Sequence, residues 1–194
     1  DTAGHLKAMP CAWLLPNSNL KIAEYPVMAT ETVHYVGDIV AVVVAKTAYQ
    51  AYDALDLITV KYEPLPAVVD PQKALAAGAP ELHPAVPGNQ AFHWTVSGGD
   101  AAAAFAAPDA VVVTDRIVQQ RLIPTAMEPR SAVAQWMAAA GELTLWNTTQ
   151  NPHIARFIGS IVTGVPEDKL RVVAPEVGGG FGSKIPQYPG EFIA

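Results

Sequence analysis

The sequence predicts an α+β fold, and three observations support this class. A strand–helix–strand pattern spans residues 39–62, two segments of alternating side chains at 131–137 and 142–148 predict a hairpin, and a helical pattern over 153–163 precedes a further strand. The chain has 194 residues, of which 51% are hydrophobic, so it is long enough for one large or two small folding units.

The first group of elements is a small α/β module. Residues 39–45 form a continuous run rich in β-branched side chains, which indicates a strand buried on both faces. Thr47 is a good N-cap for a helix over residues 48–55. Residues 57–62 alternate between apolar and polar side chains, which indicates a second strand that Pro64 ends.

The second group follows a stretch rich in Pro, Gly and Ala. Asp100 is placed to cap a short helix over 101–106, and residues 109–121 form a long β-prone segment. Beyond the predicted hairpin, residues 153–163 have apolar side chains at helical spacing, with a proline at the first turn and a glycine just past the end. Residues 170–174 predict a strand.

This last strand leads into a glycine-rich run, Val177–Lys184, with the sequence VGGGFGSK. Four glycines around one phenylalanine allow the backbone to approach a ligand closely and leave N–H groups available. Such amides form concave sites for anions or for oxygens bound to a metal. The spacing fits neither a Walker A loop nor a dinucleotide-binding fingerprint. Taken alone, the run is equally consistent with a tight turn.

Composition excludes several functions. The formal net charge is −6 and no block of like charges occurs, which argues against a nucleic-acid groove or a polybasic membrane patch. No apolar run is long enough to span a membrane. Cys11 is the only cysteine, which excludes an internal disulfide, an iron–sulfur cluster held by this chain and a Cys-rich zinc site. The five histidines are scattered, so we assign no metal ligand.

Five segments together resemble one protein family. The segments Gln150–His153 (QNPH) and 174–184 (APEVGGGFGSK) resemble the large subunit of molybdenum hydroxylases, the family of xanthine dehydrogenase, aldehyde oxidase and aerobic carbon monoxide dehydrogenase. Residues 36–41 (VGDIVA) and 60–66 (VKYEPLP) resemble the α/β-hammerhead domain of that family, and 127–130 (MEPR) resembles its carbon monoxide dehydrogenase-like branch.

The resemblance implies a domain organisation. Residues 1–80 would be a partial α/β-hammerhead domain, 81–100 a linker, and 101–194 the N-terminal part of the molybdopterin-binding α+β domain. The catalytic subunit of the family is several times longer and carries its glutamate base near its C-terminus, so no catalytic residue is assigned here. We therefore expect a fragment that shows no turnover alone, whether it is a truncated piece, a proteolytic product or one chain of a naturally split enzyme.

The resemblance also implies a cofactor site. The cofactor would be molybdopterin with molybdenum, in the cytosine dinucleotide form of the bacterial branch. The side chain of Gln150 would reach the apical oxo group, and the backbone of Gly179, Gly180, Phe181 and Gly182 would contact the cofactor. An amide N–H can donate to such an oxygen without adding charge. The ring of Phe181 would form a wall of the substrate channel.

The implied reaction is oxidation of an aldehyde, an N-heterocycle or carbon monoxide, with water as the oxygen source. Partner subunits, an FAD-binding medium subunit and a small subunit with [2Fe–2S] clusters, would receive the electrons in a cytoplasmic hetero-oligomer; a membrane-associated or periplasmic location stays open. Ile185 stands where xanthine-oxidising members have an acidic residue, which argues against a purine substrate. The alternative is a non-catalytic scaffold or interaction fragment.

Individual side chains near the motifs allow simpler interpretations. Glu128 and Arg130 form either a buried polar pair that shapes the cofactor pocket or a surface turn. Glu176 is expected to be a structural carboxylate that caps neighbouring amides. Lys184 either is solvated or meets a phosphate or a neighbouring carboxylate, and His153 is expected in the first turn of a helix rather than at a metal.

Overall fold

A computed structural model describes residues 5–11, 14, 16 and 18–193. A three-stranded sheet lies at the centre of its C-terminal half. Strand β1 (Ala132–Met137) pairs with β2 (Glu142–Asn147) in an antiparallel hairpin, and β2 pairs with β3 (Leu170–Val173) in parallel. Gly141, with φ +63°, provides the left-handed residue that this tight connection requires. The hairpin and the strand at 170–173 confirm the sequence prediction.

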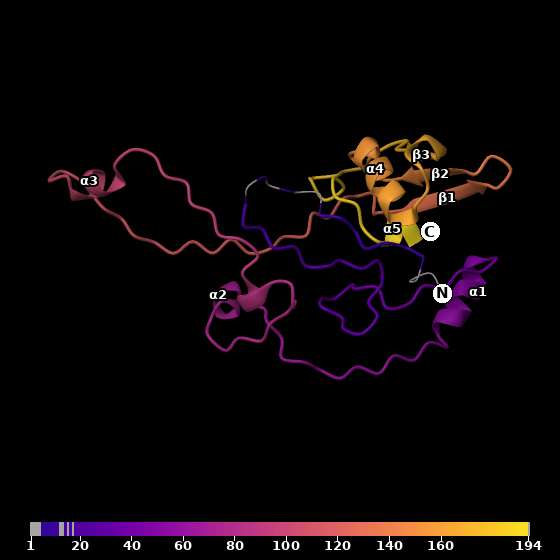
Figure 1. Ribbon diagram of the computed structural model, residues 1–194, viewed down its shortest axis with the longest axis horizontal. Coiled ribbons are helices and arrows are strands. Elements are labelled where there is room, and N and C mark those ends of the chain that lie inside the picture. The colour runs from indigo at the N-terminus through magenta and orange to yellow at the C-terminus, as the bar shows by residue number, and fades with distance from the viewer. Residues whose placement is uncertain (1–4, 12–13, 15, 17, 194) are drawn as a thin grey trace.

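Helix α4 (Pro152–Thr163) connects β2 to β3 and packs against the sheet (Figure 1). It begins where the Asn151 side chain accepts a hydrogen bond from the N–H of Ile154, and it ends at Gly164, which has a left-handed φ of +78°. Its buried residues lie on one face (Ala155, Ile158, Gly159 and Val162). The predicted helix over 153–163 is therefore confirmed, with His153 in its first turn.

The core joins segments that are distant in sequence. Its buried side chains come from β2, α4, the short helix α5 (Gly190–Ile193) and the N-terminal segment: Met9, Val27, Leu145, Ile158, Val162 and Phe192. The N-terminal segment is fixed by backbone bonds, from Lys7 N–H to the Val162 carbonyl at 3.0 Å and from Met9 N–H to the Tyr25 carbonyl at 2.8 Å. This core fixes the end of β3, from which the glycine-rich run begins.

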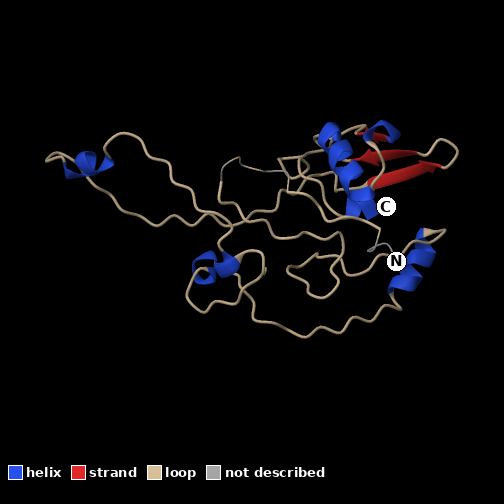
Figure 2. Ribbon diagram, in the orientation of Figure 1, coloured by secondary structure: helices blue, strands red, loops and turns tan. Residues whose placement is uncertain are grey.

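The rest of the described chain is mostly extended. Helices α1 (Ala48–Leu55), α2 (Pro71–Ala74) and α3 (Ala101–Ala106) stand on long loops, with α3 at the tip of an arm that projects far from the sheet (Figures 1 and 2). None of these three helices has a buried residue. Short 3₁₀ turns occur at Pro87–Asn89 and at Glu167–Lys169. No helix in the described ranges combines the length and apolar character needed to cross a bilayer.

The helices predicted at 48–55 and 101–106 are confirmed, but the two strands predicted at 39–45 and 57–62 are wrong. Residues 39–45, 57–62 and 109–121 are extended without forming a ladder with any described strand. A β-strand needs the backbone of a neighbour to satisfy its N–H and C=O groups. A helix satisfies its own groups locally, which is why the helical predictions in the same regions hold.

Candidate cofactor site

The glycine-rich run leaves β3 and folds into a turn with unusual backbone geometry. Gly179, Phe181 and Gly182 have φ values of +99°, +50° and +82°. Glycine adopts this region without a steric penalty, whereas a bulky residue such as phenylalanine does so rarely. Both the N–H and the hydroxyl of Ser183 donate to the Gly180 carbonyl, at 2.9 and 2.8 Å, and close the turn.

This turn presents consecutive backbone donors. Within the described residues, the N–H groups of Gly179, Gly180, Phe181 and Gly182 have no hydrogen-bond acceptor. The flanking N–H groups, by contrast, are engaged, because Gly178 donates to the Glu128 carboxylate at 2.7 Å and Ser183 to Gly180. Successive free N–H groups in a tight turn form a concave surface of partial positive charge. The surface suits oxygen atoms of a ligand.

Gln150, just beyond β2, lies against this turn. Its backbone N–H donates to the Lys184 carbonyl at 2.9 Å, and its side-chain Oε1 accepts from the Lys184 N–H at 3.2 Å. Because Oε1 is occupied in this way, the side-chain NH₂ remains as a donor with no acceptor among the described residues. A Cβ on Gly180 would overlap Cδ and Oε1 of Gln150, so glycine at 180 makes this approach possible.

Lys184 anchors the turn through its side chain, which binds Glu128. Its side chain is only 1% exposed, and its Nζ donates to both the carbonyl and the carboxylate Oε2 of Glu128, each at 2.8 Å. The hydrogen bond from Lys184, with a second from the Gly178 N–H, lowers the pKa of the Glu128 carboxyl below its ordinary value, against an opposing effect of burial. A return bond from Glu128 N–H to the Gly178 carbonyl, at 3.0 Å, completes the attachment.

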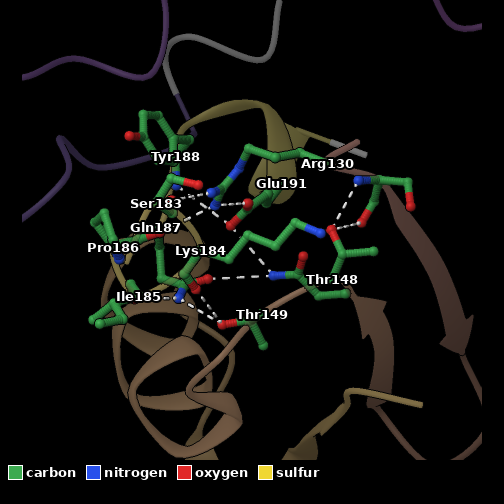
Figure 3. Close-up of polar contacts among 12 residues, drawn as sticks. Arg130, Thr148, Thr149, Ser183, Lys184, Ile185, Pro186, Gln187, Tyr188 and Glu191 are labelled. Carbon is green, nitrogen blue, oxygen red and sulfur yellow. Dashed lines mark hydrogen bonds and ion pairs between the residues drawn. The ribbon is translucent and has the colours of Figure 1, made fainter. Parts of the chain in front are cut away.

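Arg130 fixes the other end of the turn. Its guanidinium donates to the carbonyls of Ser183, at 2.6 Å, and Pro186, at 3.0 Å, and forms an ion pair with Glu191 at the start of α5 (Figure 3). Its charged group also lies 4.1 Å from the centroid of the Tyr188 ring, within the range of a cation–π contact. A planar guanidinium can make all these contacts at once, which a lysine ammonium cannot.

A buried chain of amides and hydroxyls connects these anchors. Asn147 Nδ2 donates to Gln187 Oε1 and to Glu191 Oε2, both at 3.2 Å. Gln187 Nε2 donates to the Thr149 hydroxyl at 3.1 Å, and that hydroxyl donates to the Lys184 carbonyl at 3.2 Å (Figure 3). Because these side chains are buried, each hydrogen bond also offsets a desolvation cost, and the network holds the turn in one arrangement.

Several side-chain expectations require correction. Glu128 and Arg130 do not form a pair with each other, because each binds a residue more than fifty positions away, Lys184 and Glu191 respectively. Of the alternatives for Lys184, contact with a carboxylate is confirmed, because its buried side chain binds Glu128. Glu176 is exposed and caps no amide within the described part of the chain. The burial of Lys184 had one sequence signal, since it is the only lysine or arginine in residues 172–194.

A separate cleft of about 480 Å³ lies beside α4 and β3, lined by residues that include His153, Arg156 and Lys169. None of residues 177–184 lines it. Two of its cations already form ion pairs, Arg156 with Glu167 at 3.3 Å and Lys169 with Glu142 at 3.2 Å. We therefore place the candidate site at the turn, where donors are unpaired, and not in this cleft.

The turn offers donors but no ligands for a bare metal ion. In the described ranges no group of three or more His, Cys, Asp or Glu side chains could hold a metal. The backbone N–H groups of 179–182 and the Gln150 amide instead suit oxygen atoms on a cofactor that brings its own metal ligands. The residues thus fit a molybdenum cofactor, whose oxygen atoms these donors would bind.

Two family models match the sequence. A model described as "Molybdopterin cofactor-binding domain" matches residues 82–194, and one described as "Aldehyde oxidase and xanthine dehydrogenase, a/b hammerhead domain" matches residues 9–66. The chain belongs to the molybdenum hydroxylase family. The first model includes both the donor-rich turn and Gln150.

Individual members of the family support this assignment. The chain is 39% identical to the carbon monoxide dehydrogenase large chain of Afipia carboxidovorans, over 87% of this chain and 22% of that protein. It is 35% identical to the carbon monoxide dehydrogenase large chain of Hydrogenophaga pseudoflava, over 100% of this chain and 25% of that protein. The structure of quinoline 2-oxidoreductase from Pseudomonas putida 86 matches with a TM-score of 0.83 and 32% identity, over 100% of this chain and 24% of that one. The chain therefore spans about a quarter of the length of these molybdenum hydroxylases.

Proposed function

We propose that this chain contributes part of the molybdenum-cofactor site in the catalytic subunit of a hydroxylase. The observation that carries this proposal is the cluster of unpaired donors, four backbone N–H groups of 179–182 beside the free NH₂ of Gln150. All these donors are neutral, so they can bind oxygen ligands without changing the net charge of the site. The anchors beneath them hold the donors in place before any ligand arrives.

The residues have distinct roles in this proposal. Gln150 would donate a side-chain N–H to an oxygen atom of the cofactor, and the backbone N–H groups of Gly179, Gly180, Phe181 and Gly182 would orient it. The Phe181 ring, 76% exposed, borders the substrate channel and excludes water. When bound, the cofactor supplies a two-electron oxidation in which the oxygen added to substrate comes from water. We assign no proton transfer to a residue of this chain.

The proposal extends to the whole enzyme. The substrate is an aldehyde, an N-heterocycle or carbon monoxide, and Ile185 at the edge of the turn argues against a purine. The cofactor is the cytosine dinucleotide form of molybdopterin, and an FAD-binding subunit and a [2Fe–2S] subunit complete a cytoplasmic hetero-oligomer. Two relatives are carbon monoxide dehydrogenase large chains, and the designation "large chain" supports a hetero-oligomer. The domain limits 1–80, 81–100 and 101–194 stay a prediction.

The test is a pair of substitutions that change single features of the donor cluster. Gln150→Glu keeps the acceptor for the Lys184 N–H but replaces the NH₂ donor by an oxygen, and Gly180→Ala displaces the Gln150 side chain. Loss of a hydrogen bond to a group bound to a metal typically weakens metal retention about 10- to 100-fold, so we expect molybdenum per subunit to fall and its X-ray absorption spectrum to change. The matched control is Gln135→Glu, on the exposed part of β1.

The outcome separates an enzyme from a scaffold. A native preparation that contains molybdenum, iron and flavin, and loses molybdenum in both variants but not in the control, supports the proposal. An unchanged molybdenum content and spectrum in both variants would contradict the roles of Gln150 and Gly180. A preparation without any of the three would support the non-catalytic alternative.

A further inference from the structure

Lys184 occupies an unusual position, because it is attached to both halves of the proposed site. Its backbone holds Gln150 twice, through the Gln150 N–H at 2.9 Å and the Gln150 Oε1 at 3.2 Å. Its side chain crosses beneath the turn to Glu128, whose carboxylate also accepts from the Gly178 N–H. Lys184 thus connects the side-chain donor Gln150 to the turn that carries the backbone donors of 179–182.

The chemistry of this contact is costly for a residue that serves stability alone. The Lys184 ammonium loses its hydration because its side chain is 1% exposed, whereas the Glu128 side chain is 30% exposed. A buried charge of this kind often contributes no more to stability, even when paired, than apolar groups of the same shape. Nζ has three protons, and two of them bind the carbonyl and the carboxylate of one residue, Glu128. This bidentate attachment fixes the direction as well as the length of the contact.

The geometry around Glu128 shows which elements the pair holds. The segment 127–130 lies directly under the first glycines, because a Cβ on Gly178 would come within 2.6 Å of the Glu128 Cβ. A shift of Glu128 would therefore move Gly178, and a shift of Lys184 would move Gln150. The amide orientation of Gln150, with Oε1 inward and NH₂ free, depends on the same Lys184 backbone.

We propose that Lys184 and Glu128 are positioning residues, which set the separation and orientation of the Gln150 amide relative to the backbone donors of 179–182. The inference rests on the function proposed above for those donors. Neither residue needs to touch the cofactor. Their effect is transmitted through the Gly178 N–H on one side and the Lys184 backbone on the other.

The decisive experiment uses the double variant Lys184→Met with Glu128→Gln in the native holoenzyme. The two substitutions have nearly the same shape as the original side chains and leave no unpaired charge, so we expect the melting temperature to stay within about 4 °C of the parent. We nevertheless expect cofactor retention on dialysis to fall about 10-fold or more, because the donors are no longer held in register. Hydrogen exchange of residues 177–184 should become faster in the cofactor-free protein.

The matched control is the second lysine–glutamate pair, Lys169 with Glu142, changed in the same way to methionine and glutamine. In this pair Nζ lies 3.2 Å from the carboxylate, compared with 2.8 Å in the Lys184–Glu128 pair, but both side chains are about 40% exposed. The pair lies where β2 begins, at the opposite end of that strand from Asn147 and Gln150. We expect its loss to leave cofactor retention and the exchange of 177–184 unchanged. Glu128→Asp provides a milder change, since it keeps the charge and shortens the side chain by one methylene group; it should reduce retention without affecting folding.

The outcomes are distinguishable from those of the proposed function. A double variant with normal stability, normal exchange at 177–184 and normal cofactor retention would overturn the positioning role. That result would leave the donor role intact if the Gln150 and Gly180 variants still lose molybdenum. If those two variants keep molybdenum, the proposed function fails, and the exchange measurement in the cofactor-free protein still decides whether Lys184 and Glu128 hold the turn.

Discussion

The two halves of the described chain differ in how their backbone N–H and C=O groups are hydrogen-bonded. Residues 132–193 form a sheet, a capped helix and a turn with many long-range hydrogen bonds, and they share one core. Residues 39–66 and 101–123 contain the helices α1 and α3 but form no strand ladder, and their valines and leucines are largely exposed. The difference shows that the candidate site is built where tertiary contacts are dense, since preorganised donors need such support.

The largest effect that separates the halves should come from matched apolar truncations. Leu145, 3% exposed in β2, packs in the core, so Leu145→Ala should lower the free energy of unfolding of the 194-residue chain by about 2–5 kcal/mol. Val44→Ala, at a position 87% exposed, should change it by less than about 0.5 kcal/mol. Denaturant unfolding measures the free energy of unfolding of both variants. Equal losses of stability would show that the two halves of the chain do not differ in packing.

A smaller effect is expected from the helix caps. Asn151→Ala removes the acceptor for the Ile154 N–H at the start of α4 and should cost about 1 kcal/mol of global stability, because α4 belongs to the core. Thr47→Ala removes the equivalent bond to Gln50 at the start of α1, which has no buried residue, and should reduce only local helicity. Circular dichroism during urea unfolding distinguishes a loss of global stability from a loss of local helicity. A loss of global stability in Thr47→Ala would contradict the prediction.

The smallest effect is a local response to acid at the turn. Because the pKa of Glu128 is lowered in the folded protein, the stability from its carboxylate is present above the ordinary value of 4.5 and is lost as pH falls through the lowered value. Hydrogen exchange of the Gly178 amide should therefore stay slow down to that lower pH and then accelerate, after correction for the intrinsic pH dependence. The Glu128→Gln variant should not show this transition, and a transition that persists there must come from another group.

Sequence reasoning succeeded where the determinants are local. Thr47 and Asp100 cap the helices that they were expected to begin, and Gly141 lies in the turn of the predicted hairpin. It failed for the strand at 39–45, because β-branched composition favours an extended backbone but does not supply a partner.

The site was only partly predictable for a related reason. The glycine-rich motif and Gln150 could be recognised as segments, whereas the pairing of Glu128 with Lys184 and of Arg130 with Glu191 spans more than fifty residues. Nothing in the local sequence around a charged residue specifies such a distant partner. A lysine is also solvated by default, so its burial becomes visible only when the surrounding segments are assembled.

Phe181 has a consequence for how this protein responds to selection. A left-handed backbone costs a non-glycine residue roughly 1–2 kcal/mol, and this ring is too exposed to regain that cost through packing. A screen of variants for thermal tolerance alone should therefore enrich glycine or asparagine at position 181. If a screen for catalytic turnover restores phenylalanine, the energetic burden of this single side chain would be a measure of what the ring contributes to the reaction.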